Sequence, residues 1–220
     1  MIRKNQKAYV VPVNVDVLTK MEEDPDLKSI VQKADLVLTD SQILVWVSKF
    51  LRKPVKEKIS GSDLVPKLCK VSAKKGYTLY FLGAGKGVGK QAASRMRKRY
   101  PNIRIAGTYS PPMGFEKNQE EVDHINQLIT AAHPDILIVS FGCPKQEKWI
   151  AENYKKYDAK VSICAGATLD FLSGNVKRAP KWMSQAGLEW FYRFLQEPKR
   201  LFKRYFLDGF YLLKLLWKYR

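Results

Sequence analysis

The residue with the clearest catalytic potential is Asp40, which directly follows the apolar run from Ala34 to Thr39. A carboxylate at the carboxyl end of a strand could remove a proton from a substrate as a general base. It could equally cap a helix that begins near Ser41, which is a common use of Asp. Asn14 closes the strand-like run before it and has the same two interpretations. Both side chains are therefore candidates for an active site.

A glycine-rich loop follows another apolar run and opens a helix-like segment. Its alternating glycines are Gly83, Gly85 and Gly87. They would let the backbone approach a phosphate closely. The loop departs from a Walker A motif at Ala84 and Gln91, and from the Gly-x-Gly-x-x-Gly fingerprint at Val88. A phosphate-binding loop of another type and a tight turn between a strand and a helix are both compatible with it.

A third polar cluster follows the apolar run from Ile136 to Val139. Pro144 suits the first turn of a helix, where its missing N–H costs nothing. Lys145 and Gln146 then stand near a helix N-terminus, where backbone N–H groups and the helix dipole attract anions. Open α/β sheets bind ligands at such junctions. An ordinary loop with solvated lysines explains the segment equally well.

Metal-binding patterns are weak in this sequence. The Asp-x-Asp triplet at Asp24 to Asp26 follows polar residues rather than a strand, which favours the start of a helix over a metal site. His124 and His133 lack nearby ligand partners, so neither zinc nor a histidine-based triad is indicated. We expect no metal at the site.

Strand-like and helix-like segments alternate through most of the chain. Strands are expected at Ala8–Val13, Leu36–Leu38, Thr78–Leu82, Ile103–Ala106, Ile136–Val139 and Val161–Cys164. Helices are expected at Ser41–Leu51, Ser62–Lys75, Gly87–Tyr100, Lys117–Ala132 and Pro144–Tyr154. This alternation predicts an α/β fold with a Rossmann-like, mostly parallel sheet and helices on both faces.

The net charge of +18 over 220 residues indicates an anionic partner, such as nucleic acid, an anionic membrane or a phosphorylated substrate. Residues 1–175 are expected to form the catalytic domain and residues 176–220 a basic helical appendage, because the composition changes near Gly174. Aromatic residues are interleaved with the basic ones, and a helix from Lys199 to Tyr219 would lie on a membrane rather than cross it. Packing of these aromatics on the core is the alternative.

The expected compartment is the cytoplasm. The first residues lack the apolar core of a signal peptide, and no uninterrupted apolar run reaches the ~18 residues of a membrane span. The three cysteines lack metal-ligand spacing, which is typical of a reducing compartment.

Several of these segments together resemble the WecG/TagA/CpsF family of bacterial glycosyltransferases. The matching segments are Pro12–Asn14, Ala34–Asp40, Gly61–Leu64, Phe81–Ala84, Gly142–Trp149, Ala167–Gly174, Val176–Trp182 and Gly187–Arg200. The resemblance implies an inverting transfer from a UDP-sugar, with N-acetylmannosamine as the expected sugar, to a polyprenyl-diphosphate-linked N-acetylglucosamine. It also implies a metal-independent enzyme, peripheral on the inner face of the bacterial membrane, in polysaccharide or teichoic-acid synthesis.

The resemblance also implies roles for individual residues. The family's carboxylate base falls on Asp40 and its active-site Asn on Asn14. Its nucleotide-side Gln falls on Gln146, and two arginines of its tail fall on Arg193 and Arg200. Lys58 stands where the family usually has Arg, and lysine cannot bind a diphosphate with two parallel hydrogen bonds. With Lys145 and the three loop glycines, these residues make up the expected site.

Two other functions compete with this interpretation. A nucleic-acid-binding protein would also use basic and aromatic residues, but the sequence has no recognisable reader motif and its tail charge has an amphipathic period. A Rossmann dehydrogenase is disfavoured by the broken dinucleotide fingerprint. Within the family, a different UDP-hexose donor for capsule or exopolysaccharide is the alternative, and a homo-oligomer stays open.

Overall fold

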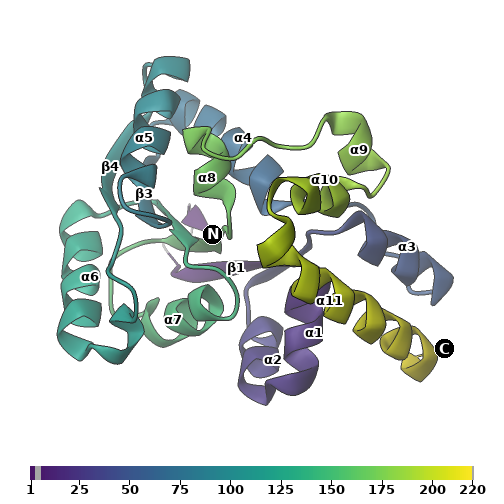
Figure 1. Ribbon diagram of the computed structural model, residues 1–220. Coiled ribbons are helices and arrows are strands. Elements are labelled where there is room, and N and C mark those ends of the chain that lie inside the picture. The colour runs from purple at the N-terminus through teal and green to yellow at the C-terminus, as the bar shows by residue number, and fades with distance from the viewer. Residues whose placement is uncertain (3–5, 220) are drawn as a thin grey trace. The chain divides into compact units, whose positions relative to one another are not determined.

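The computed structural model describes residues 1–2 and 6–219 (Figure 1). Its strands are β1 (Ala8–Val13), β2 (Leu36–Thr39), β3 (Thr78–Gly83), β4 (Arg104–Tyr109), β5 (Ile136–Ser140) and β6 (Val161–Cys164). Its helices up to Ser173 are α1 (Val15–Glu23), α2 (Pro25–Gln32), α3 (Gln42–Phe50), α4 (Gly61–Lys75), α5 (Val88–Arg99), the 3-10 helix η2 (Phe115–Lys117), α6 (Gln119–Ala132), α7 (Lys145–Asn153) and α8 (Thr168–Ser173). The remaining helices are α9 (Lys181–Gln185), α10 (Glu189–Gln196) and α11 (Pro198–Tyr219).

The strands form one sheet in the order β2-β1-β6-β5-β3-β4. Parallel pairing joins β1 to β6, β6 to β5, β5 to β3 and β3 to β4. Figure 1 shows α4, α5 and α8 on one face of this sheet and α6 and α7 on the other. The predicted α/β fold, with a parallel sheet between helices and a helical C-terminal part, is confirmed.

The chain forms two compact units. The first, here called the sheet unit, consists of Met1–Val11, Ile30–Val37 and Gly61–Val176. The second, here called the helical unit, consists of Pro12–Ser29, Leu38–Ser60 and Lys177–Arg220. The last residues of β1 and β2, and the polar residues that follow them, therefore belong to the helical unit.

The core of the sheet unit follows from continuous apolar strands. All five residues of β5 are buried, and so are five of the six residues of β3. Strands covered on both faces by helices are typically apolar throughout, because neither face meets water. The largest fully buried side chains of this unit include Tyr157, Phe81, Leu79, Leu82, Ile125, Ile129, Leu137, Ile138, Ile150 and Leu169.

Strand β4 is longer than the sequence predicts. The prediction ended it at Ala106, whereas the strand runs on to Tyr109. Gly107 is what allows this, because a Cβ there would lie only 2.4 Å from the ring of Tyr80 on β3. The pairing register shifts beside this contact, between Leu79 and Tyr80. In the sequence, Gly107 suggests the end of a strand. In the structure, its missing side chain leaves room for the ring of Tyr80 between β3 and β4.

In the helical unit, α11 packs against α1 and α10. Leu201 is buried on its packed side, and so is Asp208. Tyr211 on the same helix donates a hydrogen bond to Glu23 of α1. Asp208, an acid among the apolar residues of α11, therefore faces the protein rather than solvent.

Candidate active site

The ends of β1 and β2 bring Asn14 and Asp40 together in the helical unit. The backbone N–H of Asp40 donates to the carbonyl of Val13, with an N···O distance of 2.7 Å. Val13 directly precedes Asn14, so the two polar residues lie at neighbouring strand ends. Both are partly exposed. The ends of β1 and β2 thus bring the backbones of Asn14 and Asp40 close together.

Of the two residues, only Asn14 caps a helix. Asn14 is the N-cap of α1, and its side-chain oxygen accepts from the N–H of Val17 at 3.0 Å. Asp40 is not a cap, because Ser41 takes that position on α3 and accepts from Leu44 at 3.4 Å. The capping interpretation is therefore confirmed for Asn14 and wrong for Asp40.

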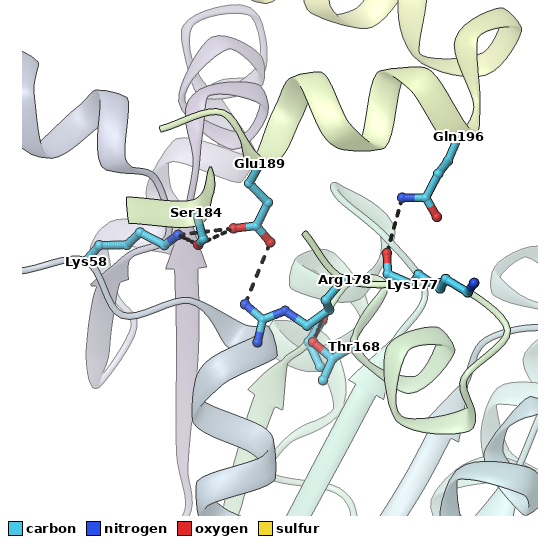
Figure 2. A network of polar contacts seen from close by, with 8 residues as sticks. Lys58, Thr168, Lys177, Arg178, Ser184, Glu189 and Gln196 are labelled. Atoms are coloured by element: carbon cyan, nitrogen blue, oxygen red, sulfur yellow. Dashed lines mark hydrogen bonds and ion pairs between the residues drawn. The ribbon is translucent and has the colours of Figure 1, made fainter. Parts of the chain in front are cut away.

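Lys58 joins the same strand end from another segment. The N–H of Ile59 donates to the carbonyl of Thr39 at 2.8 Å, which holds the residues before α4 against the end of β2. The ammonium of Lys58 donates to Ser184 Oγ at 2.7 Å and to Glu189 Oε2 at 3.1 Å (Figure 2). Its side chain is only 12% exposed. A cation is thus held in place one residue from the strand end that carries Asp40.

Glu189 is the acceptor at the centre of this network. Besides Lys58, it accepts from Ser184 Oγ at 2.9 Å, and its other oxygen lies 3.8 Å from a guanidinium nitrogen of Arg178. Burial alone would raise the pKa of the Glu189 carboxyl, but the charge and hydrogen bond of Lys58, with Ser184 and Arg178, lower that pKa below its usual value. The carboxylate is therefore ionised and shared between two cations, as Figure 2 shows.

The tail arginines lie on the helices that follow. Arg193 is on α10, one helical turn after Glu189, and is partly exposed. The end of α10 is tied back by Gln196, whose amide donates to the carbonyl of Lys177 at 3.2 Å. Arg200 lies on α11, and its side chain is outside the described part of the chain.

In the sheet unit, the loop after β3 lies against the end of β5. Gly83 pairs with Ser140, and the N–H of Ala84 donates to the carbonyl of Ser140 at 2.8 Å. Only glycine fits at position 83, because a Cβ would stand 2.6 Å from that carbonyl oxygen and its φ is +97°. The connections after β3 and β5 leave toward opposite faces of the sheet (Figure 1). Open α/β sheets typically bind ligands where neighbouring connections diverge in this way.

The predicted phosphate loop is held by a residue that the sequence analysis missed. Ser110 directly follows β4, and its hydroxyl lies 3.2 Å from the carbonyl of Gly83 and 3.3 Å from that of Gly85. Gly87 is the N-cap of α5, with a left-handed φ of +82°. The loop therefore ends in a helix N-terminus, which is a favourable place for a phosphate.

Gln146 and Lys145 lie in the first turn of α7, where the sequence predicts them. Gln146 is buried, accepts from the N–H of Gly166 at 3.0 Å and donates to Glu147 at 2.8 Å. The ammonium of Lys145 pairs with Glu116 at 2.9 Å, and this contact lowers the pKa of the Glu116 carboxyl. Gln146 thus fixes the loop after β6, and any anion that Lys145 bound would compete with Glu116.

The Asp-x-Asp triplet begins a helix. The carboxylate of Asp24 accepts from the N–H of Leu27 at 3.0 Å at the start of α2, which confirms the turn interpretation. Across residues 1–2 and 6–219, no group of three or more His, Cys, Asp or Glu side chains is arranged to hold a metal ion.

One family of known proteins matches this chain. The profile of the glycosyl transferase WecG/TagA/CpsF family matches residues 1–220. A Bacillus spizizenii protein named N-acetylglucosaminyldiphosphoundecaprenol N-acetyl-beta-D-mannosaminyltransferase is 34% identical over 197 residues, which are 90% of this chain and 74% of that protein. Proteins of the same name from Bacillus subtilis (strain 168) and Staphylococcus aureus (strain MRSA252) are 35% and 28% identical over 193 residues, which are 88% of this chain and 73% and 74% of theirs.

Proposed function

Because this chain belongs to the WecG/TagA/CpsF family of glycosyltransferases, we propose that it transfers N-acetylmannosamine from a UDP-sugar to N-acetylglucosamine carried on diphosphoundecaprenol. The observation that carries this proposal is the activity for which the Bacillus spizizenii relative is named, since that protein matches 90% of the chain. The β-linkage in the same name supports an inverting reaction from an α-linked UDP-sugar.

Asp40 is the proposed general base. It removes the proton from an acceptor hydroxyl as that oxygen forms a bond to the anomeric carbon, and the bond from that carbon to the UDP oxygen breaks with its electrons going to UDP. Its strand-end position beside Asn14, with no capping duty, supports this role. General base catalysis of this kind typically contributes ~10²–10⁴-fold.

Positive side chains of the helical unit are proposed to stabilise diphosphate charge. Lys58 and Arg193 carry this role among the described side chains, and Arg200 is added from the family resemblance. The held position of Lys58 supports it, because a cation that is oriented before the reaction costs no reorganisation when charge develops.

We assign the nucleotide to the sheet unit, at Gly83, Gly85, Gly87 and the start of α7. The divergence of the connections after β3 and β5, which leave toward opposite faces of the sheet, supports this assignment. The buried Gln146 is proposed to act by fixing the backbone at Gly166, since both ends of its amide are engaged within the protein.

Helix α11 is proposed to dock on the inner face of the bacterial membrane as part of the 176–220 appendage. Its exposed apolar residues recur at helical spacing, and Phe202, Phe206, Phe210, Leu213 and Trp217 are 63–87% exposed. None of the described helices is long and apolar enough to cross a bilayer. An amphipathic helix with basic residues lies in the interface instead. Tyr211 of the same helix donates a hydrogen bond to Glu23 of α1 instead.

A donor screen tests the proposed function. The full chain is given a lipid-diphosphate-linked N-acetylglucosamine analogue and a panel of UDP-hexoses and UDP-N-acetylhexosamines, and release of UDP is measured. We expect the greatest rate with UDP-N-acetylmannosamine, and release that depends on the acceptor. A preference for another UDP-hexose would move the protein to the capsule-type alternative. No acceptor-dependent release with any donor would overturn the proposal.

A further inference from the structure

Glu189 is an acid in a strongly basic part of the chain. Three acids oppose eleven basic residues between Lys177 and Arg220. Glu189 is the one that accepts from Lys58 and Ser184 and pairs with Arg178. An ionised carboxylate beside cations that are meant for an anionic substrate is electrostatically unfavourable for binding, so its presence calls for an explanation.

We propose that Glu189 is a positioning residue that holds Lys58 and Arg178 as an oriented pair of cations for a diphosphate group. This inference rests on the proposed function, because that function supplies the diphosphate. Its ligand chemistry is common to the UDP-sugar donor and to the lipid-linked acceptor.

The geometry of the network supports orientation by Glu189. Lys58 comes from the segment before α4, and Arg178 from the segment before α9, about 120 residues further along the chain. The two carboxylate oxygens face different partners: Oε2 accepts from Lys58, and Oε1 faces Arg178 (Figure 2). One carboxylate thus fixes two distant cations at the same place.

Donor capacity is left over after these contacts. A lysine ammonium has three N–H donors. Within the described residues, Lys58 uses two of them, on Ser184 and on Glu189. The third can donate to an oxygen of a substrate while the other two keep the ammonium from turning. Ser184 completes the arrangement, because its hydroxyl accepts from Lys58 and donates to Glu189.

The same contact fixes helix α10. Glu189 is its first residue, so the bond to Lys58 anchors the start of the helix, while Gln196 anchors its end to Lys177. Arg193 lies between these two anchors. Glu189 therefore acts on a third cation of the site through the helix that carries both residues.

Two roles of Glu189 predict opposite changes in diphosphate affinity when it is replaced by Gln. If Glu189 does not orient the cations, Glu189→Gln removes a negative charge near an anion site, and diphosphate binds more tightly. If Glu189 does orient them, the same change releases Lys58 and Arg178, and diphosphate binds more weakly. A stabilising role alone would not produce the second result.

The test is calorimetric titration of inorganic diphosphate and of UDP into the full chain. The variants are Glu189→Gln, Glu189→Asp and, as a matched control, Glu152→Gln at an exposed acid of α7. We expect Glu189→Gln to weaken diphosphate binding by about tenfold, by analogy with the ~10–100-fold cost of losing a partner that orients a metal ligand. Glu189→Asp keeps the charge but withdraws the carboxylate, so it should weaken binding as well. Glu152→Gln should bind as wild type does.

Equal or tighter binding of diphosphate by Glu189→Gln would overturn the proposal, and so would a wild-type protein that binds neither diphosphate nor UDP. Ser184→Ala provides a milder variant should Glu189→Gln fail to fold, and the same sign is expected. In the transfer assay, a rise in the donor KM or in the acceptor KM identifies which diphosphate the pair holds. If no donor supports transfer by wild type, the proposed function fails, while the sign of the binding change still decides the role of Glu189.

Discussion

Asp40 is the proposed general base, and its substitution tests that role. Asp40→Asn keeps the shape of the side chain and removes its basicity, so the turnover number should fall ~10²–10⁴-fold. Binding of UDP and the thermal midpoint should change little, because Ser41 rather than Asp40 caps α3. Steady-state UDP release, calorimetry and a thermal melt measure the three quantities.

Asp26→Asn is the matched control for this substitution, since Asp26 is exposed in the first turn of α2. It should leave turnover unchanged. Retention of more than about a tenth of the wild-type rate by Asp40→Asn is too much for the loss of a general base and would remove Asp40 from that role.

The lowered pKa of the Glu189 carboxyl predicts that the stability of the protein depends on pH. Because the pKa of its carboxyl is lowered in the folded protein, its contribution to the free energy of unfolding is present above the unfolded-state value of about 4.3. That contribution is lost as the pH falls through the lower folded-state pKa. At pH 7, Glu189→Gln should lower the free energy of unfolding by about 1.5–3 kcal/mol, the usual range for hydrogen bonds to charged groups.

Urea unfolding at neutral and at acid pH measures this contribution. The difference between wild type and Glu189→Gln should shrink from about pH 5 to about pH 3. Glu152→Gln, an exposed acid, serves as the control. A difference that stays constant over this range would show that Glu189 does not act through its charge.

The residues at strand ends could be predicted from the sequence, but the residues that position the site's loop and cations could not. Asp40 and Asn14 could be predicted, because a polar residue directly after an apolar run marks the end of a strand. Glu189 and Ser110 could not, since their partners lie far away in the sequence. The only signal for Glu189 was an acid in a strongly basic tail.

The exposed apolar side chains of α11 predict that this helix binds anionic membranes. Phe206→Ser, Phe210→Ser and Trp217→Ser together remove three of its apolar side chains, which are 66–87% exposed and contribute little to the core. The triple variant should sediment with anionic vesicles much less than wild type does. Added salt should also weaken binding by wild type, because attraction to anionic lipid is worth ~1 kcal/mol per basic residue near the surface.

Met113→Ser is the control for the triple variant, since Met113 is 96% exposed in the sheet unit. It should not change sedimentation. Equal sedimentation of wild type and triple variant would exclude α11 as the docking element. These substitutions are preferable to removing the helix, because loss of α11 would also remove the buried Leu201 and Asp208.

The strands were more predictable than the short helices. Each predicted strand is present within a few residues, because buried parallel strands are continuous apolar runs. Helices α1, α8, α9 and α10 were not predicted. They are only five to nine residues long, and their periodicity is too brief to recognise. In α1, for example, Asp16 and Thr19 are buried with Val17, which hides the apolar face.

The net charge of +18 is large enough to balance the charge of the diphosphates in the proposed reaction without a metal ion. We therefore expect transfer to proceed in EDTA at the untreated rate. The measurement is UDP release before and after chelation. Loss of activity in EDTA, with recovery on adding Mn²⁺ or Mg²⁺, would show that a metal neutralises the diphosphate in place of lysine and arginine.

The linkage in the reaction product is the sharpest test of the proposed transfer. The full chain is incubated with UDP-N-acetylmannosamine and a lipid-diphosphate-linked N-acetylglucosamine analogue, and the lipid product is examined by mass spectrometry and NMR. The account predicts that a single N-acetylhexosamine is added to the N-acetylglucosamine, with a β-configuration at the new anomeric carbon. An acceptor left unchanged by this donor, or a product with an α-linkage, would contradict it.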